Sequence, residues 1–384
     1  MKQITKFYIS SFLKNQTYFV PVFVVILQLY QLSYIEIFLI FTLSNVLKLF
    51  IEIPTGIFAD IYGKRRSIQI SKLLILLSFI GFGFSWNFWT FLVFQLLYEL
   101  GNAFRSGTET GYVYDYIQQN PENPSYTKVK GNQKFYARIG EGIATTLGGF
   151  IAAGIGYSAV FFFAAIPAFI NFIFSLTWEK IKESEKGITK TDLYSKFQSS
   201  YHFIKNNSYA VRLILNVMIF TGGVAAISKL IQPYMQKTII PIEYFGIVYT
   251  VFLVIAAFAV KYSYIFEEKF GKIIIINLFS ILSAVLLFVV GYGYVGILGI
   301  LILFLVITAE NIRSPISNTL FHENIDSEKR STLGSTLELG KALAGIIIMP
   351  IVGLLSDSFS IFYAVMFLAV LLLLNSIVFN IRQR

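Results

Sequence analysis

Long apolar segments follow one another along almost the whole chain, and they constrain its fold more than any other feature. A helix that crosses the hydrocarbon core of a bilayer needs about 20 mostly apolar residues. The sequence therefore predicts an all-α membrane protein with twelve transmembrane helices, at residues 7–31, 35–59, 67–86, 88–116, 130–155, 157–178, 210–236, 242–262, 272–291, 294–321, 332–356 and 360–381.

Composition supports the same class of protein. Hydrophobic residues make up 56% of the chain and charged residues 14%, whereas soluble domains average about 45–50% and about 25%. These values exclude a soluble globular enzyme. The chain has no cysteine and two isolated histidines, His202 and His322, so we expect neither a metal site nor a cofactor.

The surplus of Lys and Arg, which gives a net charge of +10, lies in short clusters between the spans. Such clusters are typical of cytoplasmic loops, so we expect a lipid bilayer and no nucleic acid as partner. One side of the predicted membrane collects nearly all of these residues, among them Lys64 and Lys72, and the other side holds only Lys237. We therefore predict a multi-pass protein of the inner (cytoplasmic) membrane with both termini in the cytoplasm.

The one long polar stretch, residues 179–209, divides the chain into two halves of six spans, residues 1–178 and 210–384. Apolar residues within it recur at helical spacing, which predicts an interfacial amphipathic helix. They are Leu193, Phe197, Tyr201 and Ile204; His202 between them is interpreted as a surface residue.

The two halves resemble each other at several positions. One constant shift along the chain places Gly63-Lys64 on Gly271-Lys272, Asp115 on Glu323 and Arg105 on Arg313. Gene duplication explains these matches, and chance matching of a few residues is the alternative.

Charged residues inside the predicted spans recur every third helix. An ionised side chain that faces lipid costs several kcal/mol, so charged spans must face protein or water. This periodicity predicts three-helix units whose first helix lines a central cavity. The candidates for cavity charge and proton coupling are Lys14, Glu52, Glu99, Arg105, Glu109, Lys229, Glu310 and Arg313.

Two pairs of these residues stand at helical spacing. Arg105 and Glu109 are separated by four positions and Glu310 and Arg313 by three, so we expect each to form an intrahelical ion pair. Exchange of these partners would let a carboxylate take up and release a proton. The alternative is that both pairs only fix the register of the helices.

The segment after the second span reads Gly56-Ile57-Phe58-Ala59-Asp60-Ile61-Tyr62-Gly63-Lys64-Arg65-Arg66. It resembles the loop motif G-x-L-a-D-r-x-G-r-k of the major facilitator superfamily, with Ile61 in place of the usual basic residue. The resemblance implies two pseudo-symmetric six-helix bundles and a cytoplasmic latch made by Gly56, Asp60, Gly63, Lys64, Arg65 and Asp115.

In that latch, Asp60 would meet the start of the eleventh span near Ser331 and Thr332, and Arg65 would meet Asp115. The alternative is that the basic residues only anchor a cytoplasmic loop. The fifth span has Gly142, Gly148 and Gly149 but lacks the Gly-Pro pair of the family's antiporter pattern. Those glycines are therefore interpreted as close helix-packing sites.

The function predicted from these features is secondary active transport by alternating access, as a monomer. No nucleotide-binding motif is present, so we do not expect ATP to be the direct energy source. We favour proton-coupled export of a small organic or drug-like compound. The alternatives are an importer or facilitator for a sugar, amino acid or other metabolite and, more remotely, a membrane enzyme or receptor. Tyr30, Tyr112 and Tyr249 would suit an amphipathic or cationic substrate if their rings face the cavity.

Because the natural chain lacks cysteine, single cysteines report its topology directly. We expect a membrane-impermeant thiol reagent to label Cys at Lys64 or Lys186 from the cytoplasmic side, and Cys at Ser33 or Ser358 from the outside. Labelling of the Ser33 position from the cytoplasmic side alone would overturn the predicted orientation.

Overall fold

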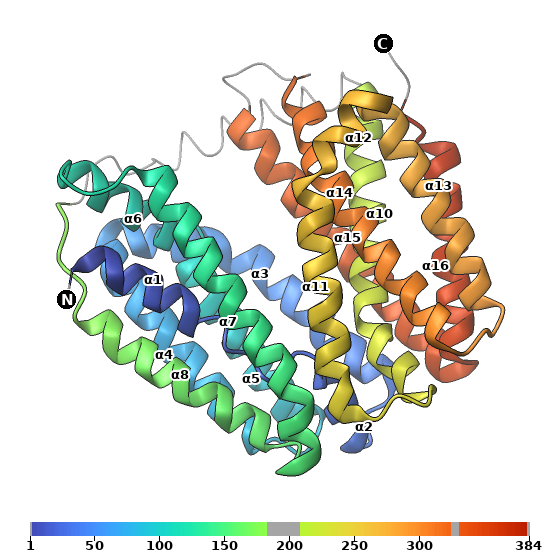
Figure 1. Ribbon diagram of the computed structural model, residues 1–384, viewed down its shortest axis with the longest axis horizontal. Coiled ribbons are helices and arrows are strands. Elements are labelled where there is room, and N and C mark those ends of the chain that lie inside the picture. The colour runs from blue at the N-terminus through green and yellow to red at the C-terminus, as the bar shows by residue number, and fades with distance from the viewer. Residues whose placement is uncertain (1, 183–207, 324–329, 382–384) are drawn as a thin grey trace. The chain divides into compact units, whose positions relative to one another are not determined.

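The computed structural model describes residues 2–182, 208–323 and 330–381, and every regular element within these ranges is helical (Figure 1). Nine of these described helices are long and apolar enough to cross a membrane. The all-α membrane class is therefore confirmed, while the number of twelve spans stays a prediction. The amphipathic helix predicted around His202 lies outside the described residues.

The helices group into two compact units. The described residues of unit 1 fall within Met1–Leu32, Leu47–Gly187 and Pro241–Thr250, and those of unit 2 within Ser33–Val46, Ile188–Ile240 and Val251–Arg384. Two helices, α3 (Tyr34–Tyr62) and α11 (Phe245–Lys261), contribute residues to both units.

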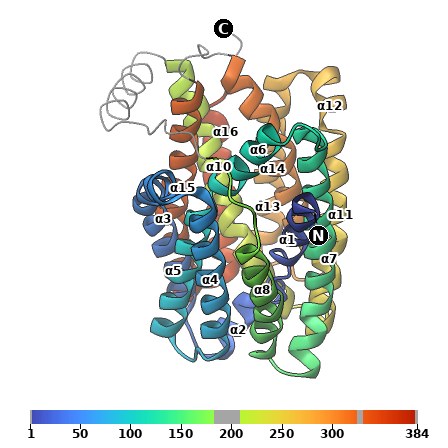
Figure 2. The same cartoon turned by 90° about the vertical axis from the view of Figure 1, so that its left-hand side faces the viewer.

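Unit 1 is built on α4, which contacts both α5 and α8, while α1 contacts α7 and α8 (Figure 2). Its helices are α1 (Gln3–Leu13), α2 (Phe23–Leu29), α4 (Lys64–Gly83), α5 (Phe88–Arg105), α6 (Thr108–Gln119), α7 (Tyr126–Gly154), α8 (Ala159–Leu176) and the 3-10 helix η1 (Ile242–Tyr244).

In unit 2, α13 packs against α14 and α16, and α10 packs against α14, α15 and α16. The bounds of these helices are α10 (Ser208–Gln236), α12 (Ser263–Phe270), α13 (Lys272–Gly291), α14 (Ile297–Glu323), α15 (Arg330–Ser358) and α16 (Ile361–Val378).

Two of the predicted continuous spans are interrupted. The first stops at Leu13 and resumes at Phe23, and the fourth divides into α5 and α6. In the first interruption, Asn15 Nδ2 donates to Ser11 O at 2.7 Å and Tyr18 OH donates to Gln16 Oε1 at 2.8 Å. Local bonds of this kind compete with the helical pattern, so the apolar composition alone overestimates the length of these helices.

Helix α7 lies close to this interrupted stretch because it carries glycines there. A methyl group at Gly148 would collide with the Tyr18 carbonyl oxygen, and one at Gly140 with that of Phe12. Gln16 Nε2 also donates to Gly140 O at 3.1 Å. Non-helical backbone at membrane depth must be buried in protein, and α7 provides that cover. The packing role predicted for Gly148 is confirmed, whereas a methyl group at Gly142 would meet nothing within 4 Å.

Helix α3 begins against α15 within unit 2. The Asp357 carboxylate accepts hydrogen bonds from the backbone N–H groups of Tyr34 at 2.8 Å and Ile35 at 2.7 Å. These amides have no partner inside their own helix, and the carboxylate also opposes the positive end of the helix dipole. Asp357 therefore caps a helix that is more than 300 residues away in sequence.

Replacing Asp357 by Ala removes both acceptors and should lower the free energy of unfolding by about 1 kcal/mol. Thermal unfolding of the purified protein in detergent measures this, with Ser358→Ala, an exposed neighbour, as the control. A variant as stable as the natural protein would contradict the capping role.

Candidate functional site

A cavity of about 470 Å³ opens in unit 1 and gathers most of the predicted charged residues. This volume lies in the range of small-molecule sites. Five of the eight cavity candidates line it, and Tyr98, Asn102 and Lys48 lie beside them. The five are Lys14, Glu52, Glu99, Arg105 and Glu109.

The break between α5 and α6 shapes this cavity. Helix α5 ends at Arg105, and Gly107 adopts φ +68°, a left-handed conformation that favours glycine, before α6 begins. Ser106 and Gly107 themselves line the cavity. The predicted intrahelical pair of Arg105 with Glu109 is therefore wrong, because the spacing rule requires a continuous helix.

Glu109 instead pairs with a helix far away in sequence. Its Oε2 atom lies 3.0 Å from Lys14 Nζ at the end of α1, and the Glu109 residue is only 7% exposed. Its position in the first turn of α6 also places the carboxylate at the positive end of the helix dipole. Its other oxygen, Oε1, is buried and has no hydrogen-bond partner in the described part of the chain.

Lys72 belongs to this site, although the sequence analysis grouped it with the cytoplasmic charges. It lies on α4 and is buried, with its Nζ donating to Ser10 Oγ at 2.8 Å and lying 4.1 Å from the centre of the Trp178 ring. A small pocket lined by Lys72 also touches Lys14, Arg105 and Glu109. A lysine followed by Leu-Leu-Ile-Leu-Leu was the available signal that this cation lies inside a span.

A further lysine approaches from α7. Lys130 Nζ lies 3.4 Å from Thr110 Oγ1, one residue after Glu109, and interacts electrostatically with the Glu109 carboxylate. Glu109 is thus surrounded by cations from four helices, namely Lys14 of α1, Lys72 of α4, Arg105 of α5 and Lys130 of α7.

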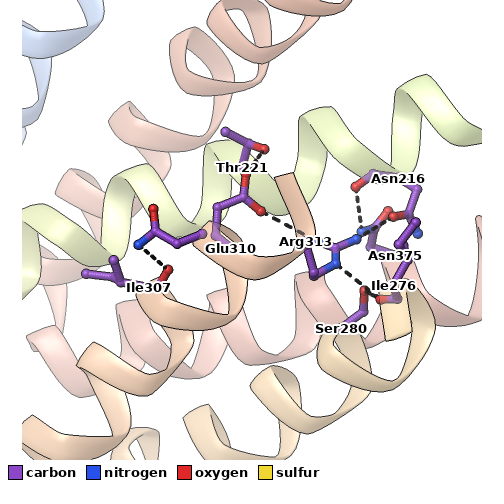
Figure 3. A network of polar contacts seen from close by, with 9 residues as sticks. Asn216, Thr221, Ile276, Ser280, Ile307, Glu310, Arg313 and Asn375 are labelled. Carbon is purple, nitrogen blue, oxygen red and sulfur yellow. Dashed lines mark hydrogen bonds and ion pairs between the residues drawn. The ribbon is translucent and has the colours of Figure 1, made fainter. Parts of the chain in front are cut away.

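The three remaining candidates lie in unit 2, where Arg313 is 1% exposed at the centre of a polar network (Figure 3). Its guanidinium donates to Asn216 Oδ1 at 2.7 Å and to Ile276 O at 3.2 Å, and it lies 3.7 Å from the centre of the Phe220 ring. These contacts tie α14 to α10 and α13, which is a structural task for a fully buried cation.

The predicted pair of Glu310 with Arg313 is confirmed, at 3.7 Å. The shorter contact of Glu310 is with Thr221 Oγ1, which donates to Oε1 at 2.6 Å (Figure 3). Glu310 therefore has two partners that orient it inside unit 2. The third candidate of this unit, Lys229, has its Nζ atom 4.0 Å from the centre of the Phe41 ring.

The motif residues between α3 and α4 adopt a different pairing from the expected one. Lys64, and not Arg65, pairs with Asp115, while Arg65 Nη2 donates to Leu176 O at 2.6 Å. Gly63, at φ +97°, is the residue before α4, and Lys64 in the first turn of α4 reaches Asp115 of α6. The expected partners of Asp60 near the start of α15 lie outside the part of the chain whose side chains are described.

Unit 2 carries the same arrangement. Gly271 has φ +80°, and Lys272 after it pairs with Glu323, just as Lys64 after Gly63 pairs with Asp115. These are the positions that the sequence repeat superimposes, so the two turns are equivalent in conformation and in ion pairing. Duplication explains this agreement better than chance does.

Comparison with known proteins places the fold. The Major Facilitator Superfamily model matches residues 8–332. The uncharacterized MFS-type transporter YxaM of Bacillus subtilis (strain 168) is 22% identical over 381 residues, covering 94% of this chain and 91% of the relative.

Two solved structures share the whole architecture. The nucleoside transporter NupG has a TM-score of 0.80 at 14% identity, covering 99% of this chain and 98% of that chain. A POT family transporter in complex with a thioalcohol-conjugated peptide has a TM-score of 0.76 at 12% identity, covering 98% and 94%. These likenesses concern the fold, and they confirm the predicted fold class.

The two motif glycines should differ in their tolerance of a methyl group. Gly63→Ala forces a left-handed alanine at the start of α4 and should lower the free energy of unfolding by about 1 kcal/mol. Gly56→Ala is the matched control, because a methyl group there meets nothing within 4 Å. Thermal unfolding in detergent compares them, and equal stability of the two variants would contradict the role of Gly63.

Proposed function

The chain belongs to the major facilitator superfamily, and from that premise we propose that it is a proton-coupled secondary transporter of a small organic compound. It would work by alternating access, with the solute bound in the cavity of unit 1. We place it in the bacterial cytoplasmic membrane as a monomer with both termini in the cytoplasm, as the distribution of basic residues predicts.

The observation that carries this proposal is the contact of Glu109 with Lys14 at the wall of the cavity. A carboxylate in a membrane protein must be paired, protonated or hydrated at each stage of a transport cycle. When Lys14 is held close, the charged carboxylate is favoured, and when Lys14 moves away, protonation is favoured. The pair therefore supplies a coupling device that needs only a change of partner.

The lining of the cavity supports a polar solute. Charged and amide side chains dominate it, including Arg105, Glu99 and Asn102. Of the proteins with the same fold, NupG is a nucleoside transporter and the POT family transporter is in complex with a conjugated peptide, and both compounds are polar. We keep export as the proposed direction from the sequence, while the density of charge favours import of a metabolite as the second candidate.

The cytoplasmic motif would act as the latch of this cycle. The pairing of Lys64 with Asp115 ties the start of α4 to α6, and Asp60 is exposed beside it. We propose that this pairing positions the turn so that Asp60 is free to bind elsewhere in one conformation.

Glu109→Gln keeps the size and polarity of the side chain but cannot exchange a proton. The purified protein is reconstituted in liposomes that contain a pH indicator, and the compounds of a panel are added one at a time. A compound that is transported should acidify or alkalinise the lumen. The panel is uridine, dialanine, glucose 6-phosphate, lactate, choline and ethidium. We expect the solute-dependent pH change in the natural protein and in Glu122→Gln, an exposed acid of the same unit, and its loss in Glu109→Gln.

An unchanged pH response in Glu109→Gln would remove the coupling role of this residue. The direction is decided separately by growth of an efflux-deficient host on toxic compounds. Expression of an exporter raises the tolerated concentration, and expression of an importer lowers it.

A further inference from the structure

The buried end of the cavity carries more positive than negative charge. The charged residues that line its small inner pocket are three cations, Lys14, Lys72 and Arg105, and one acid, Glu109. Lys130 adds a further cation that interacts with the same carboxylate. The remaining charged residues of the outer cavity are one cation, Lys48, and two acids, Glu52 and Glu99, so the cations around the site still outnumber the acids.

The groups in contact with these cations do not neutralise the excess positive charge of the pocket. Lys72 contacts a hydroxyl group and an aromatic ring, which are neutral, and Lys14 shares the single carboxylate. In the described part of the chain the Arg105 guanidinium has no hydrogen-bond partner, although it lines both pockets. Glu99 lines the outer cavity and interacts within the protein, and it does not line the inner pocket.

Buried charge is costly unless an opposite charge accompanies it, and the cost is largest where water is scarce. The start of α6 adds to the positive potential, because Thr108 to Thr110 begin a helix whose dipole faces the cavity. A ligand that supplies negative charge at this place is therefore favoured over one that is neutral or cationic.

We propose that the transported solute is a small organic anion whose carboxylate or phosphate binds between Arg105, Lys14 and Lys72. This inference rests on the proposed function and assigns the substrate class of the same cavity. The buried Oε1 atom of Glu109 accepts a hydrogen bond from a hydroxyl or amino group of the same solute, since it lacks a donor in the protein.

Binding of an anion also explains how the solute is linked to the proton. The anion attracts Lys14, which is 28% exposed and can turn toward the cavity, away from the Glu109 carboxylate. Without that ammonium group the carboxylate is stabilised less as an ion, so protonation of Glu109 becomes easier. Solute and proton then bind together, which is the coupling of a symporter, so with protons driven inward this inference favours import, the second candidate direction.

Tyr112, one of the three tyrosines considered from the sequence for a cationic substrate, does not line the cavity, where Tyr98 is the aromatic side chain instead. Tyr112 is fully buried, stacks on the Trp178 ring and donates its hydroxyl to Glu179 O. The Trp178 ring already faces the Lys72 ammonium group. Both rings therefore serve the interior of unit 1 and not the surface of the cavity.

The test compares anions with neutral compounds of the same shape. Thermal stabilisation of the purified protein in detergent is titrated with lactate and lactamide, with mandelate and mandelamide, with glucose 6-phosphate and glucose, and with choline. We expect stabilisation by anions alone, which gives the dissociation constant by linkage. The hydroxy acids and the phosphate ester distinguish a carboxylate site from a phosphate site.

Variants connect the effect to the cavity. Arg105→Gln should weaken anion binding about ten- to hundredfold, because a hydrogen bond to a charged group is lost. Arg105→Lys should bind within a few-fold of the natural protein. Lys128→Gln, which removes an exposed cation of α7, is the matched control and should bind normally. Circular dichroism verifies that each variant is folded.

Equal stabilisation by the neutral partners, stabilisation by choline instead of the anions, no stabilisation by any anion, or unchanged affinity in Arg105→Gln would overturn this inference. Proton-coupled movement of choline or of a neutral compound in the liposome assay would do the same while leaving the proposed function intact. Arg105-dependent anion binding without any proton or solute movement would support the anion site and contradict the proposed function.

Discussion

The cost of placing an ionised side chain in a bilayer governs where this chain puts its charges. Each charged group inside a span must find a partner in the protein or reach water. The two units meet this requirement differently. In unit 2, Arg313 is enclosed by Asn216, Ile276 O and Phe220 and holds three helices together. In unit 1 the charges converge on a cavity, and Glu109 is the one acid that lines its small inner pocket, beside Lys14, Lys72 and Arg105.

Interruptions of the helices create this difference. The break at Gly107 turns Arg105 and Glu109 away from a common helix face, so each is available to groups from other helices. The early end of α1 brings Lys14 to the cavity at the point where its helix stops. At the equivalent position of unit 2, α14 continues without a break through Arg313, and that arginine stays in the interior.

Much of this architecture follows from the sequence, since apolar segment length predicts the fold class and the charged spans single out Glu109 and Lys14 as candidates, which the structure places on one cavity. The repeat places Gly63 and Gly271 in equivalent turns before any coordinates are considered. Hydropathy did not reveal the helix breaks. The break at Gly107 depends on a left-handed backbone conformation, and the break at residues 14–22 depends on local hydrogen bonds and on the glycines of α7. Lys72 was misplaced because charge counting treats any basic residue near a span end as a loop residue.

We propose that one surplus of positive charge both selects the solute and controls the proton on Glu109. Calorimetric titration in buffers of different ionisation enthalpy measures the protons taken up when the best-stabilising anion of the panel binds. We predict uptake of about one proton per bound anion near neutral pH, because binding draws Lys14 from the carboxylate, and no uptake in Glu109→Gln. Anion binding to the natural protein with no proton uptake at any pH between 5 and 8 would contradict it.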